Sequence, residues 1–236
     1  MTMNKVVVIT GASQGIGAGL VRAYKELGFD VVANSRSITA SSEAGVETVA
    51  GDIGDPAVAE HLIDTALVKF GRVDTLVNNA GVFLAKPFVD YTQHEYDLVL
   101  RTNVAGFFHV TQRAARRMLD SGEGGHIVNV TTSLVESALS ALPAALASLT
   151  KGGLAAVTKA LAVEFATSGI RVNAVAPGVI KTPMHHESTH EFLKGLHPMN
   201  ELGEIEDVVR GVLYLEESPF VTGEFLHVDG GWSAGH

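Results

Sequence analysis

The sequence has 236 residues, of which 46% are hydrophobic and 18% charged, and its formal net charge is −9 at pH 7. An acidic chain repels the phosphates of nucleic acids and anionic lipid surfaces, so we expect neither nucleic acid nor membrane as a partner. The chain contains no cysteine, which excludes disulfide bonds, thiolate catalysis and zinc–thiolate sites.

The first residues, 1–9, contain a short apolar run that is too short for a secretory or membrane segment. We therefore expect a cytoplasmic protein. Apolar segments of strand length then alternate with amphipathic segments of helix length. Strands are predicted at residues 5–10, 30–34, 46–50, 73–77, 126–131, 170–175 and 224–228. Their continuous hydrophobicity indicates strands that are covered on both faces.

This alternation predicts one α/β domain over residues 1–236, a Rossmann-like, doubly wound parallel sheet of about seven strands with helices on both faces. Asp55 and Pro56 fit an N-cap and first helical position, and Thr92 with Glu95 fits a capping box. Residues 182–203 contain glycine and proline breakers and four histidines. We interpret them as a mobile lid over a substrate pocket; the alternative is a surface connection without a role.

A glycine-rich loop follows the first strand and opens the first helix, with the sequence Thr10-Gly11-Ala12-Ser13-Gln14-Gly15-Ile16-Gly17. Glycines at such a turn let the backbone approach a pyrophosphate at the positive end of the helix. Their offsets of zero, four and six differ from the zero, two and five of the common dinucleotide fingerprint. Glycines at this turn are also compatible with a purely structural role.

The loop resembles the glycine motif of the short-chain dehydrogenase/reductase family, and further matches follow in order over residues 4–232. Asp52 and Ile53 resemble the family's adenine contact, residues 78–81 its fourth-strand motif, and Asn103 the asparagine of its fourth helix. Pro177, Gly178, Ile180 and Thr182 resemble the segment beside the nicotinamide carboxamide. Residues 221–223 and 228–231 resemble its C-terminal end. The resemblance implies a nicotinamide-dependent oxidoreductase with a small-molecule substrate.

The end of the second strand favours NADP(H) over NAD(H). An acidic residue there would bind the adenosine ribose hydroxyls, but the sequence has Ser35 followed by Arg36. A guanidinium makes strong charge-assisted bonds to a 2′-phosphate; the alternative is a solvated turn residue. The cofactor-binding residues expected in all are Gly11, Ser13, Gln14, Gly15, Ile16, Gly17, Ser35, Arg36, Asp52, Ile53, Asn79, Ala80, Gly81, Lys151, Pro177, Gly178, Ile180 and Thr182.

The catalytic acid of the family is missing. The family uses a Tyr-x-x-x-Lys pair assisted by a serine and the helix-four asparagine, and Lys151 and Asn103 resemble the lysine and asparagine. The tyrosine position is Ala147, and no tyrosine lies between Tyr96 and Tyr214. Ser133 resembles the supporting serine, although its spacing to Lys151 leaves the neighbouring Thr132 and Leu134 as alternatives.

Three interpretations remain open, and we favour the first. In the first, another group supplies the proton: Ser133, a water held by Lys151 and Ser133 in the space that Ala147 vacates, or a lid histidine, His185 before the others. In the second, the protein binds NADP without turnover, as a sensor or interaction protein. In the third, Ala147 inactivates an ordinary reductase, which the uniformly apolar run around it argues against.

The lid histidines match no metal-ligand spacing, so we expect no metal. The helices predicted at residues 95–119 and 143–166 carry small and apolar residues around much of their circumference. The resemblance implies that these two helices build a dimer or tetramer, with a homotetramer as our expectation; the alternative is that their apolar faces are simply core. The substrate stays open beyond a small carbonyl compound or alcohol.

Overall fold

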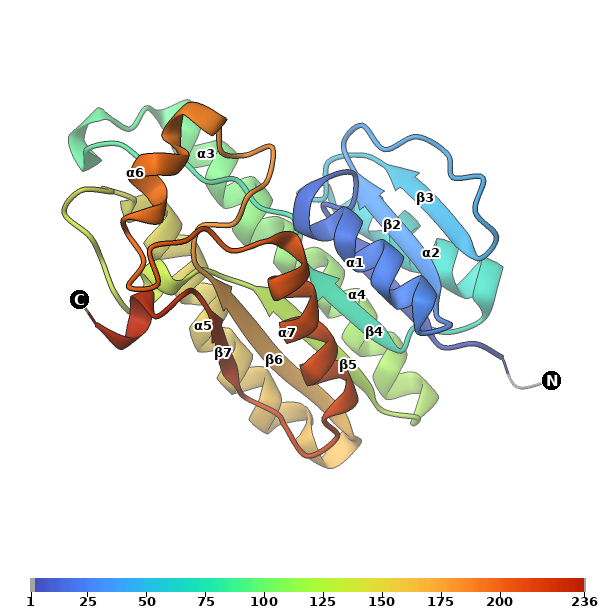
Figure 1. Cartoon of the computed structure of the whole chain (residues 1–236). Helices are drawn as coiled ribbons and strands as arrows, with labels where there is room; N and C mark the ends of the chain where they lie inside the picture. Colours follow the sequence, from blue (N-terminus) through green and yellow to red (C-terminus); the bar gives the residue numbers. More distant parts are fainter. Residues whose placement is uncertain (1–2, 236) are drawn as a thin grey trace.

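The computed structural model describes residues 3–235, so residues 1, 2 and 236 of the expected domain lie outside its description. Seven parallel strands form one sheet in the order β3-β2-β1-β4-β5-β6-β7 (Figure 1). The strands are β1 (Val6–Thr10), β2 (Asp30–Ser35), β3 (Val46–Ala50), β4 (Thr75–Asn78), β5 (Gly125–Val130), β6 (Ile170–Pro177) and β7 (Phe225–Val228). The predicted doubly wound parallel sheet is confirmed.

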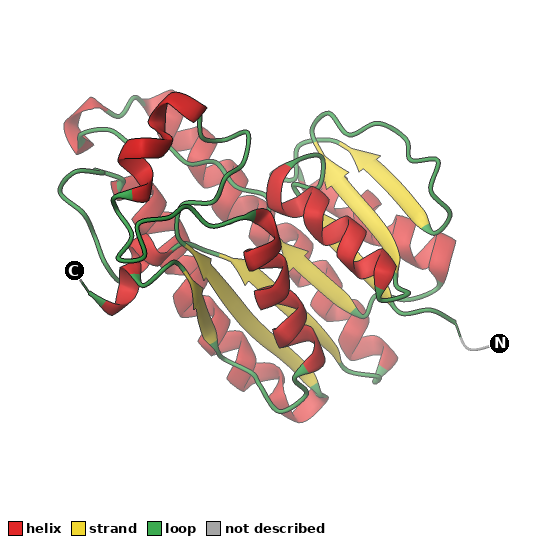
Figure 2. Ribbon diagram, viewed as in Figure 1, coloured by secondary structure: helices red, strands yellow, loops and turns green. Residues whose placement is uncertain are grey.

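Helices cover both faces of the sheet, with α1 and α7 on one face and α2, α4 and α5 on the other (Figures 1 and 2). The helices are α1 (Gly15–Glu26), α2 (Pro56–Phe70), α3 (Gln93–Leu100), α4 (Gly106–Ser121), α5 (Ala145–Phe165), α6 (His190–Lys194) and α7 (Ile205–Glu217). Side chains along β1 alternate between the two layers. Val6 and Val8 join the cluster under α2 and α4, whereas Val7 and Ile9 join the cluster under α1 and α7.

Two predicted elements differ from the structure. The fourth strand begins at Thr75 rather than residue 73; just before it, the Asp74 carboxylate accepts a hydrogen bond from the backbone N–H of Val6 (2.7 Å) and pairs with Arg72. The helix predicted at residues 95–119 is interrupted by a π-helical segment, Arg101–Ala105. Such insertions often mark functional sites.

The order of the strands reverses on either side of β1, which pairs with β2 and β4. In open α/β sheets, ligands bind beyond the carboxyl ends of the strands at such a switch point. The glycine loop after β1 and the segment after β4 therefore face the same opening.

The predicted lid, residues 182–203, contains a short 3₁₀ turn at Glu187–Thr189 and α6. Its two ends meet at a bridge between Ile180 and Gly203. The backbone N–H of Lys181 donates to the Gly203 carbonyl (2.8 Å), and the N–H of Gly203 donates to the Val179 carbonyl (3.0 Å). The lid is thus a closed loop that leaves the sheet and returns to the same point.

Candidate active site

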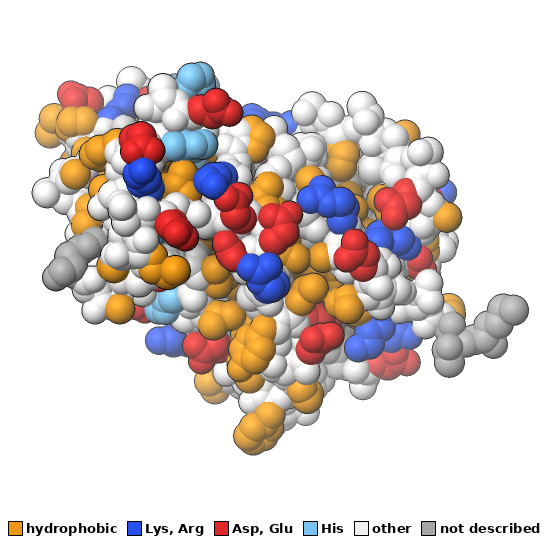
Figure 3. All heavy atoms as spheres, viewed as in Figure 1, with side chains coloured by type: hydrophobic (Ala, Val, Ile, Leu, Met, Phe, Trp, Pro, Cys, Tyr) orange, Lys and Arg blue, Asp and Glu red, His pale blue; other side chains and the backbone are white. Residues whose placement is uncertain are grey.

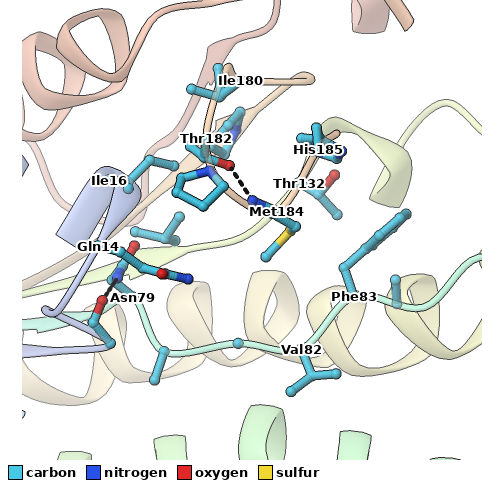
Figure 4. Close-up of a pocket in the computed structure, with 18 of the residues that line it drawn as sticks. Gln14, Ile16, Asn79, Val82, Phe83, Thr132, Ile180, Thr182, Met184 and His185 are labelled. Carbon is cyan, nitrogen blue, oxygen red and sulfur yellow. Dashed lines mark hydrogen bonds between the residues drawn. The ribbon is translucent and has the colours of Figure 1, made fainter. Parts of the chain in front are cut away.

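A cleft of about 770 Å³ runs along the carboxyl ends of the strands and continues under the lid (Figure 4). All the residues expected to bind the cofactor line it, with the exception of Gly17. In Figure 4, Gln14, Ile16 and Asn79 lie toward one end, and Thr132, His185 and Phe83 toward the other. The cleft therefore has a nucleotide end and a reaction end.

The glycine loop is shaped by contacts that a side chain would prevent. Gly11 has φ +66°, and a Cβ there would lie 2.8 Å from the Cα of Ala80. A Cβ on Gly17 would lie 2.2 Å from the Gly11 carbonyl oxygen. Gly17 therefore acts from behind the loop, which explains why it does not line the cleft.

Thr10 and Asn79 brace this loop from the ends of β1 and β4. The Thr10 hydroxyl oxygen accepts the backbone N–H groups of Asn79 (3.1 Å) and Ala80 (3.0 Å). In return, Asn79 Nδ2 donates to the carbonyls of Thr10 (3.0 Å) and Gly11 (3.1 Å). The side chain of Asn79 therefore holds the loop in place, and the residue also lines the cleft.

The nucleotide end fits a dinucleotide phosphate. The first turn of α1 opens toward the cleft at Gly15 and Ile16, where backbone N–H groups and the helix dipole favour an anion. Ser35 Oγ is buried and has no hydrogen-bond partner within residues 3–235. Beside it, Arg36 is exposed at the cleft wall. An orphaned hydroxyl next to a guanidinium is the arrangement that a ribose phosphate would satisfy.

Asp52, the expected adenine contact, lies at this end, and both oxygens of its carboxylate are engaged by other residues of the chain. One oxygen pairs with Arg101 Nε (2.8 Å) and the other accepts the N–H of Gly54 (2.9 Å). These contacts fix the turn after β3. They also connect that turn to the π-helical segment that contains Asn103.

Lys151 reaches the floor of the cleft from α5. Its ammonium donates to the Val130 carbonyl (2.7 Å), and it lies 3.1 Å from where a Cβ on Gly81 would stand. Burial lowers the pKa of Lys151 from 10.5 to about 8. The group therefore carries a proton at pH 7 and can release it near neutrality.

Asn103 is buried outside the cleft lining and supports it through the backbone. Its Oδ1 accepts the N–H of Val82 (2.8 Å), and its Nδ2 donates to the Val82 carbonyl (3.0 Å) and to Thr150 Oγ1 (3.1 Å). Both ends of the amide are occupied. The side chain thus ties the wall after β4 to α5, beside Lys151.

Ser133 and Thr132 differ in what their hydroxyls contact. Ser133 Oγ is engaged by Asp229 Oδ2 (2.8 Å) and the Ala176 carbonyl (3.2 Å), and the side chain is 1% exposed. This engagement differs from the supporting role expected for Ser133, because its proton is already committed. Both residues line the cleft, but Thr132 has only one long contact, accepting the N–H of Leu134 at 3.4 Å. The geometry favours the alternative residue, Thr132.

Ala147 lies at the reaction end and is 2% exposed. The surrounding side chains are apolar: Leu134, Val179, Leu193 and Trp232 in the buried cluster, with Phe83, Leu139 and Leu142 packed against it. The sequence had indicated an apolar environment from Phe83, residues 135–142 and the lid, but had assigned no such role to Val179 or Trp232. The sequence does carry a signal for Trp232, since it is the single tryptophan and follows the Gly-Gly turn at the end of the region that resembles the family.

His185 lines the cleft from the lid, as expected, together with Met184 and Phe192. Burial, and then the neighbouring His190, lower the pKa of His185 below its ordinary value. The imidazole is therefore neutral at pH 7, which makes it a weaker acid candidate than Lys151. Within residues 3–235, no group of three or more histidine or acidic side chains is arranged to hold a metal ion.

Comparisons with known proteins agree with this architecture. A family model described as enoyl-(acyl carrier protein) reductase matches residues 11–233. Carbonyl reductase (NADPH) 2 from Sus scrofa is 38% identical over 239 residues, covering 96% of both chains. The chain belongs to the short-chain dehydrogenase/reductase family. Family members of this kind are oxidoreductases, and the fold described above is that of the family.

Three solved structures of the family hold nicotinamide nucleotides. ElxO with NADP bound has a TM-score of 0.91 at 31% identity and covers 99% of this chain and 100% of that chain. A tyrosine-to-phenylalanine variant of ElxO holds NADPH. The 3-ketoacyl-(acyl-carrier-protein) reductase from Brucella melitensis, complexed with NADH, has a TM-score of 0.90 at 31% identity, covering 98% and 99%. A nicotinamide nucleotide is thus common to these neighbours.

Proposed function

We propose that this protein is an NADP(H)-dependent oxidoreductase that interconverts a small carbonyl compound and its alcohol, with a proton donor other than tyrosine. The observation that carries the proposal is the buried ammonium of Lys151 in the cleft, one helical turn of α5 after the small Ala147. Burying a lysine ammonium costs free energy, and the hydrogen bond to the Val130 carbonyl is its single contact of this kind among the described residues. Titratable groups with a shifted pKa cluster at functional sites, which supports a functional role for Lys151.

The bound nicotinamide would supply or accept the hydride. The chain's own residues would hold the nucleotide and handle the proton. Lys151 and Thr132 both line the cleft, and a water held between them beside Ala147 would connect them to the substrate oxygen. In the reductive direction the proton would pass from Lys151 Nζ through this water to the developing alkoxide.

The preference for NADP(H) rests on Ser35 and Arg36. Replacing Arg36 by alanine should weaken NADPH binding by roughly tenfold to a hundredfold, the scale of one charge-assisted hydrogen bond, and leave NADH binding unchanged. Titration of nicotinamide fluorescence measures both. Arg22→Ala is the matched control, since Arg22 is an exposed arginine of α1 that does not line the cleft. Equal affinity of the unmodified protein for both nucleotides would remove the assignment.

The pKa of Lys151 sets an expected pH dependence. Because the folded-state pKa is lowered to about 8, the ammonium is present below pH 8 and is lost as the pH rises through that value. Turnover in the reductive direction should therefore be flat near pH 7 and decline above pH 8. A profile of kcat/KM from pH 6 to 10 measures it, and an undiminished rate at pH 9.5 would exclude Lys151 as the proton source.

The decisive experiment is a titration with NADPH and NADH in the presence of a panel of ketones, aldehydes and quinones. NADPH binding with turnover supports the proposal. Binding without turnover supports the second candidate function, an NADP-binding sensor or interaction protein, which the apolar cluster around Ala147 favours. ElxO retains NADPH when a tyrosine becomes phenylalanine, so nucleotide binding and a tyrosine hydroxyl are separable in this family.

Homo-oligomer formation through α4 and α5 is also part of the proposal. Phe108 of α4 and Leu149 and Val163 of α5 are 52%, 60% and 80% exposed.

By length and composition alone, the helical region Ala145–Ser168 of the described chain is apolar enough to cross a membrane, with 33% of its most apolar window buried. On a different face, acidic and basic side chains are interspersed over α1 and α7 (Figure 3). A second copy packed on α4 and α5 would cover their apolar surface, by two-fold symmetry in the commonest case.

A further inference from the structure

A buried histidine at the base of the lid holds the backbone that follows β6. His197 is 4% exposed and follows α6. Its Nε2 accepts the backbone N–H of Val179 at 3.0 Å. An acceptor at Nε2 requires the neutral ring with its proton on Nδ1. That Nδ1 is buried and makes no hydrogen bond of ordinary geometry in the described part of the chain; the carbonyls of Leu193 and Lys194 are the backbone groups close enough to act on the ring.

The ring fits into a space formed by two glycines and a tryptophan. A Cβ on Gly178 would lie 2.6 Å from His197 Nε2, and one on Gly230 would lie 3.4 Å from the His197 Cβ. Trp232 meets the ring edge to face, with centroids 5.4 Å apart. The imidazole is therefore fixed in position, and its hydrogen bond to Val179 is part of a packed unit.

Val179 belongs to the strap, residues 177–182, which includes the residues expected beside the nicotinamide. The returning part of the lid segment binds both the N–H and the carbonyl of Val179: His197 accepts the N–H, and the N–H of Gly203 donates to the carbonyl at 3.0 Å. The side chain of Val179 packs in the cluster with Ala147 and Trp232. The position of the strap thus depends on the lid through His197.

We propose that neutral His197 is a positioning residue, which holds the strap and the lid in the arrangement that binds the nicotinamide end of the cofactor, and that its protonation releases them. Protonation would convert Nε2 from an acceptor into a donor that faces the donating N–H of Val179. The inference deepens the proposed function and rests on it for the identity of the ligand.

The surroundings of the ring define the direction of the pH effect. Burial lowers the pKa of His197; the carbonyls of Lys194 and Leu193 and the charge of Asp229 oppose this shift without cancelling it. Trp232 and the glycines on the other sides are uncharged. The ring is therefore neutral at pH 7 and gains a proton only in acid, below the ordinary titration range of histidine, so binding should weaken as the pH falls through that region.

Two variants test the proposal through NADPH binding. His197→Phe keeps a ring but removes the acceptor, and should weaken NADPH binding about tenfold at pH 7.5, the scale of one buried hydrogen bond. His197→Gln offers a carbonyl oxygen that accepts the Val179 N–H and does not titrate. It should bind like the unmodified protein at pH 7.5 and, unlike it, keep this affinity at pH 5.5.

Hydrogen–deuterium exchange of the peptide covering residues 176–184 is the readout that needs neither turnover nor nucleotide. Exchange should be slow in the unmodified protein and in His197→Gln at pH 7.5, and faster in His197→Phe. Unchanged exchange and unchanged NADPH affinity in His197→Phe would overturn the proposal, as would an acid limb of binding that persists in His197→Gln. If no form binds either nucleotide, the proposed function fails, while the exchange result still decides whether His197 holds the strap.

Discussion

Replacing Lys151 by methionine should lower kcat/KM for carbonyl reduction by roughly a hundredfold to ten-thousandfold, the range that a general acid contributes. Methionine keeps the length and apolar stem of lysine without its charge or its proton. With Ala147 in the tyrosine position, the Lys151 ammonium is the acid that we assign to the reaction end, because it is still protonated at pH 7 whereas His185 is neutral there. Steady-state kinetics and NADPH titration on the same samples separate turnover from binding.

Lys159→Met is the matched control, because Lys159 is an exposed lysine two turns further along α5. It should leave both quantities unchanged. If Lys151→Met retains full turnover, Lys151 is not the proton source, and His185 is the next residue to mutate. Full activity in His185→Ala would then exclude His185 as well.

Introducing tyrosine at position 147 should raise kcat by about a hundredfold or more, since the other parts of the site are in place. Residue 147 lies one helical turn before Lys151 and lines the cleft. A phenol there would stand near the ammonium, which favours loss of the phenolic proton and thus makes the hydroxyl a better acid. The same substrate panel measures the gain.

Ala147→Phe isolates the hydroxyl from the ring. Both variants place an aromatic ring among Leu134, Val179 and Trp232, so they share any steric effect on substrate. A rise in kcat in Ala147→Tyr but not in Ala147→Phe indicates a site that lacks only the tyrosine hydroxyl as its acid. Equal slowing in both variants would contradict the expected gain and would indicate a pocket rebuilt around the small side chain.

The features that the sequence predicted well depend on neighbours along the chain. Asp55 caps α2 by accepting the N–H of Ala57 at 2.9 Å, and Thr92 and Glu95 form the capping box of α3 as expected. The buried strands follow from continuous apolar runs. The lining of the cleft follows because the glycine loop and the segment after β4 lie at the carboxyl ends of adjacent parallel strands.

The features that could not be predicted depend on distant partners. The hydroxyl of Ser133 differs from that of Thr132 because it donates to Asp229, which lies 96 residues further along the sequence. The π-helical segment contains Asn103, which bonds the backbone of Val82, 21 residues earlier. No local pattern distinguishes adjacent hydroxyls or marks which amide will be buried, so these assignments need the folded chain.

The bracing of the glycine loop by Thr10 and Asn79 has a consequence for how such a protein can change over time. These contacts arise within β1, β4 and their connecting backbone, whereas the altered position, Ala147, belongs to α5. A substitution on α5 can therefore remove an acid without disturbing the support of the nucleotide loop. The contacts that support the nucleotide loop and the residue at position 147 therefore lie on different elements of the fold. Mutation can change the residue at position 147 while selection preserves the nucleotide loop.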